Sequence, residues 1–475
     1  MSAHIKFGTS GWRAVIAEEF TFENARRAVD GIAHYVCSTH PAHASAPPAL
    51  LVGYDTRFLS EIFAARTAEI LADYGIAALL SQESVPTPAL AHEIRRRKTD
   101  GGINFTASHN PAEYNGIKFS TSNGAPALPE VTKQIEAAIA NPPAPFPPAK
   151  VAVVERVDLR PAYLNDLSTK VNLELIRTSG LRMVYDPLYG AGHGFLNHLL
   201  SQAGIPLITI HGWRDVLFGG HPPEPAEEYL QSLKLAMAEN GAALGLSTDG
   251  DADRFGILDQ GGEFISPNHI IALLLDYLIE SRPWAREAGW SGGVARSVAT
   301  THLIDAVARH HGLPVHETPV GFKYIGELIE QDRIILGGEE SAGLTIRGHV
   351  PEKDGILACL LTAEMVACRQ APLRQQIKEL FRKVGSYSPG RWNVPLTETV
   401  KNRFAERIRQ EYSSFEGLRV RQTQRTDGLK LILEDDSWVL FRLSGTEPVC
   451  RLYCEAPSPA QLEELAQAAR QFLFE

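Results

Sequence analysis

The sequence is poor in several features that mark other classes of protein. Five cysteines occur among 475 residues, at positions 37, 359, 368, 450 and 454, and none forms a Cys-x-x-Cys pair. This pattern gives no support to a disulfide framework, a zinc site or a redox site. The longest apolar runs, such as Ile270–Leu275 and Ile356–Leu361, are far too short to cross a membrane. The N-terminal residues contain no apolar signal region.

Positive charge is also in short supply. The chain has 46 basic and 56 acidic residues, which gives a formal net charge of −10. A broad basic surface for nucleic acid or anionic membranes is therefore not expected. Any site for an anionic ligand must gather its arginines locally. We expect a cytoplasmic protein with neither a nucleic-acid nor a membrane partner.

The remaining composition is that of a globular chain, with 44% hydrophobic and 21% charged residues. Its length predicts about three or four domains. A pattern of strand, polar turn, helix and glycine recurs three times. The first copy begins with the strand Leu50–Gly53 and the turn Tyr54–Arg57, the second with Leu181–Tyr185 and the third with Gly293–Ala295. This alternation favours mixed or parallel sheets covered by helices, with binding loops at the strand ends.

The C-terminal part follows a different pattern. Leu429–Leu433 and Trp438–Leu443 flank a polar turn and predict a hairpin, Val449–Cys454 predicts another strand, and Ala460–Phe472 predicts a closing helix. A smaller α+β domain is expected there. The proline-rich stretch Asn141–Pro148 interrupts helices and strands, and we place the first domain boundary in it. The predicted domains are 1–145, 146–257, 258–375 and 376–475.

An acidic loop between two apolar strands is the strongest local signal. Asp249, Asp251 and Asp253 stand at alternate positions, so a looped backbone can point the three carboxylates in one direction. Clustered hard oxygens suit Mg²⁺. A calcium-binding EF-hand would need glycine and glutamate where this chain has Arg254 and Gln260. The sequence therefore predicts a magnesium loop rather than a calcium hand or a solvated acidic turn.

A serine at a strand end forms the second candidate. Ser108 lies in the segment Thr106–Phe119, directly after a short predicted strand. A serine hydroxyl needs a base or a metal to become a nucleophile, and His109 and Lys118 are candidates for the proton transfers. A lone Ser-His pair is usually an ordinary turn. The Gly-x-Ser-x-Gly elbow of esterases is missing, so a serine-esterase triad has little support.

A loop near the C-terminus could hold phosphate. The strand ending near Arg442 breaks into Ser444, Gly445 and Thr446, whose hydroxyl and backbone N–H groups can cradle an anion. Arg442 and Arg451 flank this loop and can make charge-assisted contacts with phosphate. Strand alternation places Cys450 and Cys454 on the face of the strand opposite to Arg451, where they are expected to be core residues.

Two weaker glycine-rich segments complete the set. Gly337–Gly343 follows a predicted strand and presents Glu339 and Ser341, which could bind neighbouring sugar hydroxyls. It matches neither a Walker loop nor a dinucleotide fingerprint, and a tight turn is the simple alternative. Near the N-terminus, a glycine-rich turn presents Ser10 and Arg13, and a surface loop explains it equally well.

Taken together and in this order, the motifs TASHNP, DGDADR, GEES and RLSGTEP resemble those of the α-D-phosphohexomutase superfamily, the phosphoglucomutase/phosphomannomutase enzymes. The similarity runs from Phe7 to about Tyr453. It implies an α/β fold of four domains, three of them repeated mixed α/β sandwich domains and the last an α+β domain, around a central cleft. It also implies a monomer or a weak dimer.

The resemblance assigns roles to particular residues. Ser108 falls where the family carries its phosphoserine and, with the three aspartates, would hold Mg²⁺. Arg13, His109 and Lys118 match positions tied to phosphoryl and proton transfer, and we expect Arg254 to contact the phosphoryl group. The expected substrate-binding residues are Ser10, Lys323, Glu339, Ser341, Lys353, Arg442, Ser444, Gly445, Thr446 and Arg451.

The implied reaction interconverts hexose 1-phosphate and hexose 6-phosphate through a phosphoserine enzyme and a bisphosphorylated sugar. Glucose 1,6-bisphosphate is the expected activator. Family members that prefer glucose tend to carry GEES, as this chain does, whereas dual-specificity members tend to carry GEMS. Phosphomannomutase or dual activity is the alternative, and phosphoglucosamine mutase is less favoured. A serine-nucleophile sugar phosphatase and a non-catalytic sugar-phosphate binder are the competing classes.

Overall fold

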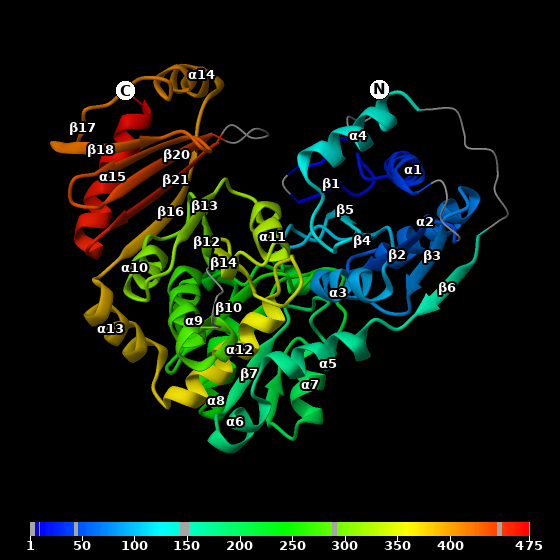
Figure 1. Cartoon of the computed structure of the whole chain (residues 1–475), viewed down its shortest axis with the longest axis horizontal. Helices are drawn as coiled ribbons and strands as arrows, with labels where there is room; N and C mark the ends of the chain where they lie inside the picture. Colours follow the sequence, from blue (N-terminus) through cyan, green and yellow to red (C-terminus); the bar gives the residue numbers. More distant parts are fainter. Residues whose placement is uncertain are drawn as a thin grey trace. The chain divides into compact units, whose positions relative to one another are not determined.

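The computed structural model describes residues 5–8, 10–41, 46–142, 152–286, 292–443 and 449–474. The chain divides into two compact units. Figure 1 labels the helices and strands along the chain. The first unit contains Met1–Pro267 and Gly321–Arg374, and the second contains Asn268–Val320 and Gln375–Glu475. The segment predicted as the third domain, 258–375, contributes to both units. The three boundaries between the four predicted domains stay predictions.

A six-stranded mixed sheet forms the N-terminal part of the first unit. Its strand order is β1–β5–β4–β2–β3–β6. Neighbours are parallel from β4 to β6, whereas β5 runs antiparallel to both β1 and β4. The strands are β1 (Trp12–Val15), β2 (Ala49–Tyr54), β3 (Ala77–Ser81), β4 (Gly101–Phe105), β5 (Tyr114–Thr121) and β6 (Val154–Val157).

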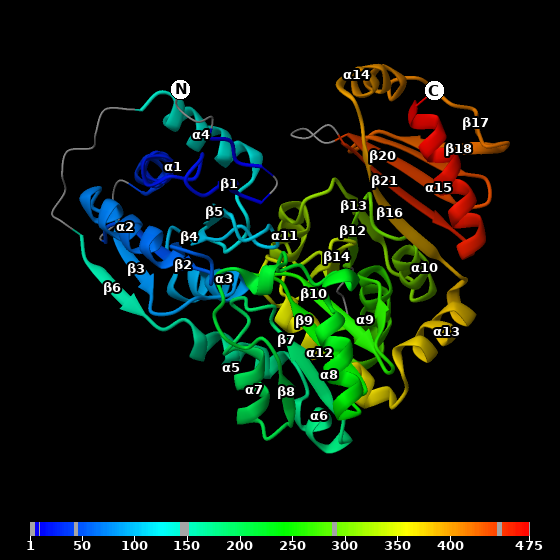
Figure 2. The ribbon, with the colours of Figure 1, turned by 180° about the vertical axis from the view of Figure 1, so that it is seen from behind.

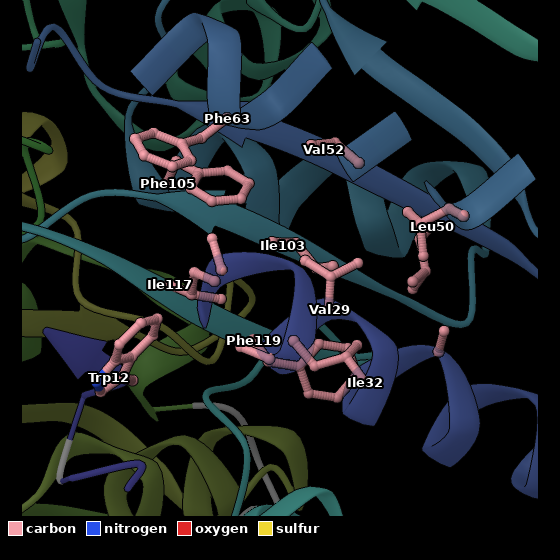
Figure 3. Packing of buried hydrophobic residues seen from close by; sticks show 14 of the residues in the cluster. Trp12, Val29, Ile32, Leu50, Val52, Phe63, Ile103, Phe105, Ile117 and Phe119 are labelled. Carbon is pink, nitrogen blue, oxygen red and sulfur yellow. The ribbon is translucent and has the colours of Figure 1, made fainter. Parts of the chain in front are cut away.

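Helices cover both faces of this sheet. They are α1 (Phe22–Thr39), α2 (Ser60–Asp73), α3 (Thr87–Arg97) and α4 (Pro129–Ala140). Phe63 of α2 stacks on Phe105 of β4 with ring centroids 5.9 Å apart, and Ile32 of α1 joins the same buried cluster (Figure 3). On the other face, a Cβ at Gly102 would lie 2.7 Å from Ile94 of α3. Glycine at this position lets α3 pack close to the sheet.

The second repeat also forms a mixed sheet, with strand order β11–β10–β9–β7–β8. β7 is parallel to β8 and β9, and β10 is antiparallel to β9 and β11. The strands are β7 (Met183–Asp186), β8 (Leu207–Thr209), β9 (Leu244–Thr248), β10 (Phe255–Asp259) and β11 (Glu263–Ile265). The helices are α5 (Arg160–Lys170), α6 (Leu173–Ser179), α7 (Leu196–Gln202) and α8 (Gln231–Asn240), with 3-10 turns at Phe218–Gly220 and Glu227–Tyr229.

The third repeat supplies strands to both units. In the first unit, β14 (Ile334–Glu339) is antiparallel to β15 (Gly343–Ile346), next to α11 (Phe322–Glu330) and the buried α12 (Gly355–Arg369). In the second unit, β12 (Gly293–Ser297) is parallel to β13 (Val315–Thr318). The accompanying helices are α9 (Pro267–Ser281), the 3-10 turn Pro283–Arg286 and α10 (Leu303–His310).

The C-terminal sheet is antiparallel, with strand order β16–β21–β20–β19–β18–β17. One helix, α15 (Pro459–Phe474), lies along its face in both views (Figures 1 and 2). Cys450 and Cys454 are buried in the core beneath that helix, as predicted. The other elements are α13 (Leu373–Val384), β16 (Ser388–Pro395), α14 (Glu398–Arg407), β17 (Ser414–Phe415), β18 (Leu418–Gln424), β19 (Leu429–Leu433), β20 (Trp438–Leu443) and β21 (Val449–Ala456).

The predicted fold class is confirmed in its layers. Three repeats combine parallel and antiparallel strands with covering helices, and the C-terminal part is α+β. Two local predictions are wrong. Gly337–Glu339 belongs to β14 rather than to a loop after it, and Arg13 lies on β1 rather than in a turn. Among the described residues, no single helix is long and apolar enough to span a membrane, and α12 with α13 meets that test only as a bent pair.

Candidate active site

Ser108 lies in a loop between β4 and β5, which we call the serine loop (residues 106–113). Its backbone has a φ of 53°, in the left-handed region that non-glycine residues seldom adopt. The Oγ donates a hydrogen bond to Oδ2 of Asp249 at 2.7 Å and lies 3.3 Å from Nδ1 of His109. The backbone N–H donates to Oγ1 of Thr106 at 2.8 Å, which closes the turn. The serine is only 1% exposed.

The three aspartates lie together in the loop between β9 and β10, which we call the metal loop (residues 249–254). One carboxylate oxygen from each of Asp249, Asp251 and Asp253 lies within 4.8 Å of the others. Oδ1 of Asp251 and Oδ1 of Asp253 are buried and have no hydrogen-bond partner. Buried oxygens without donors are costly unless a cation or another ligand satisfies them. The donor set therefore fits a hard cation such as Mg²⁺.

Two lysines contact this triad from other strands and loops. Lys118 of β5 lies 2.5 Å from Oδ2 of Asp251 and 2.8 Å from Oδ2 of Asp253. Lys353 lies 3.1 Å from Oδ2 of Asp253 and 2.9 Å from Oε1 of Glu352. Burial disfavours both ammonium groups, but the carboxylates outweigh it, so the pKa of each lysine is raised. Both lysines are therefore charged at neutral pH.

The aspartates differ in their electrostatic environment. Burial and repulsion from Asp253 and Asp251 raise the pKa of Asp249 well above its ordinary value. Burial acts in the same direction on Asp253, but Lys118 and Lys353 outweigh it and lower the pKa of that carboxyl. The Asp249 carboxyl, which faces Ser108, is therefore less well neutralised by its surroundings than the Asp253 carboxyl.

His109 and two arginines surround the serine. Burial and the charges of Arg254 and Arg13 lower the pKa of His109 well below its usual value, so its imidazole is neutral at pH 7. Nη1 of Arg13 donates to Oδ1 of Asn110 at 2.7 Å, which joins β1 to the serine loop. The backbone N–H of Arg254 donates to Oδ1 of Asp249 at 3.0 Å. The predicted transfer residues thus converge around Ser108.

The predicted sugar-binding segment borders the metal loop. The N–H of Phe255 donates to the carbonyl of Ala342 at 3.2 Å, and Ser341 lies in the same turn, half-buried. Oε1 of Glu339 accepts from the N–H of Gly321 at 2.8 Å. Burial, with repulsion from the next glutamate, raises the pKa of Glu339 to about 7. This carboxyl is therefore balanced between its two protonation states near neutral pH.

Two other predicted substrate residues lie in the first unit. Ser10 lines a small pocket together with Lys118 and Glu352. Lys323 is in the first turn of α11, with its Nζ 5.5 Å from the ring centre of Tyr324, and burial lowers its pKa. These placements leave the proposed substrate contacts of both residues as predictions.

The predicted phosphate loop belongs to the second unit. Arg442 of β20 and Arg451 of β21 are cross-strand partners, and Nε of Arg442 donates to Oδ2 of Asp427 at 2.8 Å. The other three members of the predicted loop, Ser444, Gly445 and Thr446, lie outside the described residues. The phosphate-binding role of all five residues stays a prediction.

Three residues that contact the site are not among those predicted from the sequence. Thr87, in the first turn of α3, donates its hydroxyl to Oδ2 of Asp251, and its N–H donates to the Asp251 carbonyl at 3.0 Å. Asn110 binds Arg13, and Glu352 binds Lys353. Asn110 lies within the TASHNP motif and could have been singled out. Thr87 is far from the aspartates in sequence and carries no local signal.

Comparison with known protein families supports the resemblance to phosphohexomutases along nearly the whole chain. Sequence models of the phosphoglucomutase/phosphomannomutase family match in order. The alpha/beta/alpha domains I, II and III match residues 4–144, 161–262 and 266–384, and the C-terminal domain matches residues 393–471. The site and the fold thus define one class of α/β enzyme.

Individual relatives match this chain over nearly its whole length and carry names of sugar-phosphate mutases. A Thermococcus kodakarensis protein named phosphoglucomutase/phosphomannomutase is 30% identical, with 99% of this chain and 98% of that protein covered. A Methanothermobacter thermautotrophicus protein, provisionally named phosphoglucosamine mutase, is 30% identical, with 98% and 97% covered. The crystal structure of a Thermus thermophilus protein, provisionally named phosphomannomutase, has a TM-score of 0.85, 33% identity and full coverage of both chains. The chain belongs to the phosphoglucomutase/phosphomannomutase family and is an intramolecular phosphotransferase of the isomerase class.

Proposed function

We propose that this enzyme interconverts hexose 1-phosphate and hexose 6-phosphate, with glucose as the preferred sugar, through a phosphoserine at Ser108. One observation carries the proposal. The Ser108 hydroxyl lies 2.7 Å from Asp249, inside a cluster of carboxylates with unpartnered buried oxygens. A serine placed there can hold a phosphoryl group next to a cation site. A buried serine with a purely structural role would not need a neighbouring cation site.

The reaction has two transfers related by symmetry. The P–Oγ bond of phosphoserine breaks as the free hydroxyl of the sugar phosphate forms a new P–O bond, which gives a bisphosphorylated sugar. The sugar then presents its other phosphate, which returns to Ser108. As the P–Oγ bond breaks, neutral His109, with Nδ1 3.3 Å from Oγ, can pass the proton of the attacking hydroxyl to the Ser108 oxygen. In the second transfer Ser108 gives up this proton again, and it goes to the sugar oxygen that leaves.

Neutralisation of charge is the second requirement. Mg²⁺ held by Asp249, Asp251 and Asp253 would withdraw negative charge from the transferring phosphoryl oxygens. The chain itself adds Lys118, Lys353 and Arg254 around the same point. Because the two lysines are fixed by carboxylates, they are preorganised before substrate arrives.

The preference for glucose rests on the GEES segment. Glu339 and Ser341 border the metal loop, where a carboxylate and a hydroxyl can bind neighbouring sugar hydroxyls. The phosphate that is not reacting would bind the arginines of the C-terminal sheet, Arg442 and Arg451. Relatives carry names for glucose, mannose and glucosamine phosphates, so mannose 1-phosphate and glucosamine 1-phosphate are the competing substrates.

A direct assay tests this proposal. Enzyme, Mg²⁺ and a trace of glucose 1,6-bisphosphate are incubated separately with the 1-phosphates of glucose, mannose and glucosamine, and the 6-phosphates are measured. We expect glucose 1-phosphate to be converted with the highest kcat/KM of the three sugars. A higher kcat/KM for either of the other sugars would overturn the glucose preference.

Measuring free phosphate in the same reactions separates a mutase from a phosphatase. A mutase keeps the phosphoryl group on enzyme or sugar, so inorganic phosphate should stay near the background level. The enzyme should also gain the mass of one phosphoryl group, located on Ser108, after exposure to glucose 1,6-bisphosphate. Release of inorganic phosphate at the rate of substrate loss would replace the mutase with a sugar phosphatase.

A further inference from the structure

The first repeated turn, Tyr54–Arg57, has no role in the reaction described so far. Arg57 follows β2, and its guanidinium is completely buried, with 0% of the side chain exposed. A buried guanidinium is costly to desolvate unless its N–H groups find acceptors or a counter-ion. Its partners therefore indicate what it does.

Those partners are carbonyl oxygens of the serine loop and its junction with β5. Nη1 and Nη2 donate to the carbonyls of Ser108 (2.7 Å), Asn110 (2.5 Å), Pro111 (2.7 Å) and Tyr114 (3.0 Å). Nε forms an ion pair with Oδ2 of Asp55 at 3.2 Å. Arginine presents five N–H donors in a rigid plane, so the four carbonyls are held in one fixed arrangement.

The loop that Arg57 holds is under backbone strain. Ser108 has a φ of 53°, and its carbonyl lies so close to the metal loop that a Cβ at Gly250 would be 2.4 Å from it. This carbonyl is also an acceptor of the Arg57 guanidinium. Strained conformations persist where surrounding contacts hold them. The Ser108 backbone therefore needs contacts that hold it in place, and the hydrogen bond from Arg57 to its carbonyl is one of them.

A second arginine supports the first. Arg214, in the segment after β8, donates to the carbonyls of Thr56 and Arg57, each at 3.0 Å, and binds Glu61 at 2.7 Å. The ring of Phe218 lies 5.0 Å from Cζ of Arg57 and covers the guanidinium. The turn that carries Arg57 is thus fixed by residues of the second repeat.

We propose that Arg57 is a positioning residue for phosphoryl transfer: it holds the serine loop by its carbonyls so that the Ser108 Oγ faces the metal loop. The proposal rests on the function proposed above for Ser108. Arg57 has no contact with substrate in this role and acts only through the backbone of the serine loop. A misplacement of about 1 Å at a reacting group can cost about 10²-fold in rate.

The test compares two buried arginines. Arg57→Lys keeps the charge next to Asp55 but loses the planar fork. The matched control is Arg296→Lys in the second unit, because Arg296 is 3% exposed and binds Asp305 (2.8 Å) and Glu317 (2.6 Å). For both variants, kcat and KM for glucose 1-phosphate, thermal midpoints and hydrogen exchange of peptides from residues 105–116 are measured with the full-length enzyme.

We expect Arg57→Lys to lower kcat about 10²-fold, to leave KM within about threefold, and to speed exchange in the serine loop. The control should lose thermal stability to a similar extent, keep kcat within about twofold and leave exchange in that loop unchanged. Adding methylguanidine to Arg57→Ala should restore part of kcat. Wild-type kcat and exchange in Arg57→Lys, or an equal loss of kcat in the control, would overturn the positioning role.

The exchange measurement separates this inference from the proposed function. If the wild-type enzyme converts no sugar phosphate, the proposed function fails. The hold of Arg57 on the serine loop is then still supported if Arg57→Lys, unlike the control, accelerates exchange in residues 105–116, and it is contradicted if Arg57→Lys does not.

Discussion

Two buried clusters of charge, one in each unit, differ in how completely their oxygens are bonded. In the first unit, Oδ1 of Asp251 and Oδ1 of Asp253 have no donor. In the second unit, Glu455 accepts from the N–H of His302 at 2.9 Å and from Nε1 of Trp438 at 2.8 Å, and Thr301 donates to its other oxygen. The fully bonded Glu455 carboxylate serves the fold, whereas the unbonded oxygens clustered in the metal loop leave room for a ligand.

The cations of the clusters differ in the same sense. In the first unit, carboxylates raise the pKa values of Lys118 and Lys353. In the second, Lys430 lies under Trp438, 4.0 Å from its ring centre, and donates to the Val298 carbonyl at 2.7 Å. Burial and the charge of Arg296 lower the pKa of Lys430 to about 7. The lysines of the first cluster keep their charge because carboxylates surround them. The lysine of the second cluster is packed in a place where burial and a neighbouring arginine disfavour its charge.

The largest effect is expected at the serine. Ser108→Ala removes the hydroxyl that we propose as the carrier of the phosphoryl group, so kcat should fall on the order of 10⁴-fold or more. The thermal midpoint should change little, because one hydrogen bond to Asp249 is lost and the site gains no new charge. Steady-state kinetics and calorimetry check this. An alanine variant with the parent's turnover would remove Ser108 from the mechanism.

The next effect concerns the cation. Saturating Mg²⁺ at 100 times its Kd should stabilise the enzyme by about 2.7 kcal/mol, seen as a raised thermal midpoint. Asp251→Asn should abolish this shift and lower kcat by about 10²–10³-fold, since the metal contribution is several kcal/mol. Glu455→Ala, by contrast, should keep the Mg²⁺ shift while losing about 3 kcal/mol of stability from three unpaired donors. Equal Mg²⁺ shifts in parent and Asp251→Asn would contradict the metal assignment.

A third effect concerns the pH dependence of substrate binding through the buried Glu339. Glu339 has a pKa raised to about 7, so it loses its negative charge as pH falls from 8 to 6. The ionised form accepts hydrogen bonds from sugar hydroxyls better, so KM for glucose 1-phosphate should rise as pH falls through 7. Glu339→Gln should remove this dependence and lower kcat/KM about 30-fold, since hydrogen bonds to charged groups contribute about 1.5–3 kcal/mol. A pH profile of KM identical in parent and variant would contradict this role.

The smallest effect lies in the second cluster. The pKa of Lys430 falls from 10.5 to about 7 on folding, so the unfolded chain binds this proton more tightly between those pH values. The contribution of Lys430 to stability therefore rises with pH in that window, by at most about 1.4 kcal/mol per pH unit. The stability advantage of Lys430→Met over the parent should shrink accordingly between pH 7.5 and 8.5, measured by denaturant unfolding.

Lys383→Met is the control for that measurement. Lys383 belongs to the same unit, and although burial opposes its charge, Asp276 and Glu280 raise its pKa. Its protonation is therefore the same in folded and unfolded chains between pH 7.5 and 8.5. A pH-independent difference is expected for Lys383→Met, and the same result for Lys430→Met would show that Lys430 is solvated.

The sequence predicted best those features that depend on neighbours in the chain. The hairpin strands Leu429–Leu433 and Trp438–Leu443 match β19 and β20 to the residue, because alternation and a polar turn define both ends. The prediction of a loop at Gly337-Gly338 is wrong. These glycines lie inside β14, where a Cβ at Gly337 would be 2.2 Å from Cγ2 of Ile325 in α11. Helix packing, rather than a turn, requires glycine at position 337.

The site shows the same division. Ser108 and the aspartates stood out because each lies in a distinctive local motif, and the family resemblance is confirmed. Thr87 and Arg57 did not stand out, because their partners are 164 and 51–57 residues away along the chain.

The third repeat is divided between the units. Its Val298 and Ala299 pack against Trp438 and Leu440 of the C-terminal sheet, a long-range contact that composition does not encode.

The four loop acceptors of Arg57 are peptide carbonyls, which every amino acid supplies alike. Outside the motif TASHNP, the side chain at position 114 is therefore free to change over evolutionary time while Ser108 keeps its place. Position 57 has no such latitude, because no other side chain offers a planar fork of donors. Homologous enzymes should vary around this arginine and retain it.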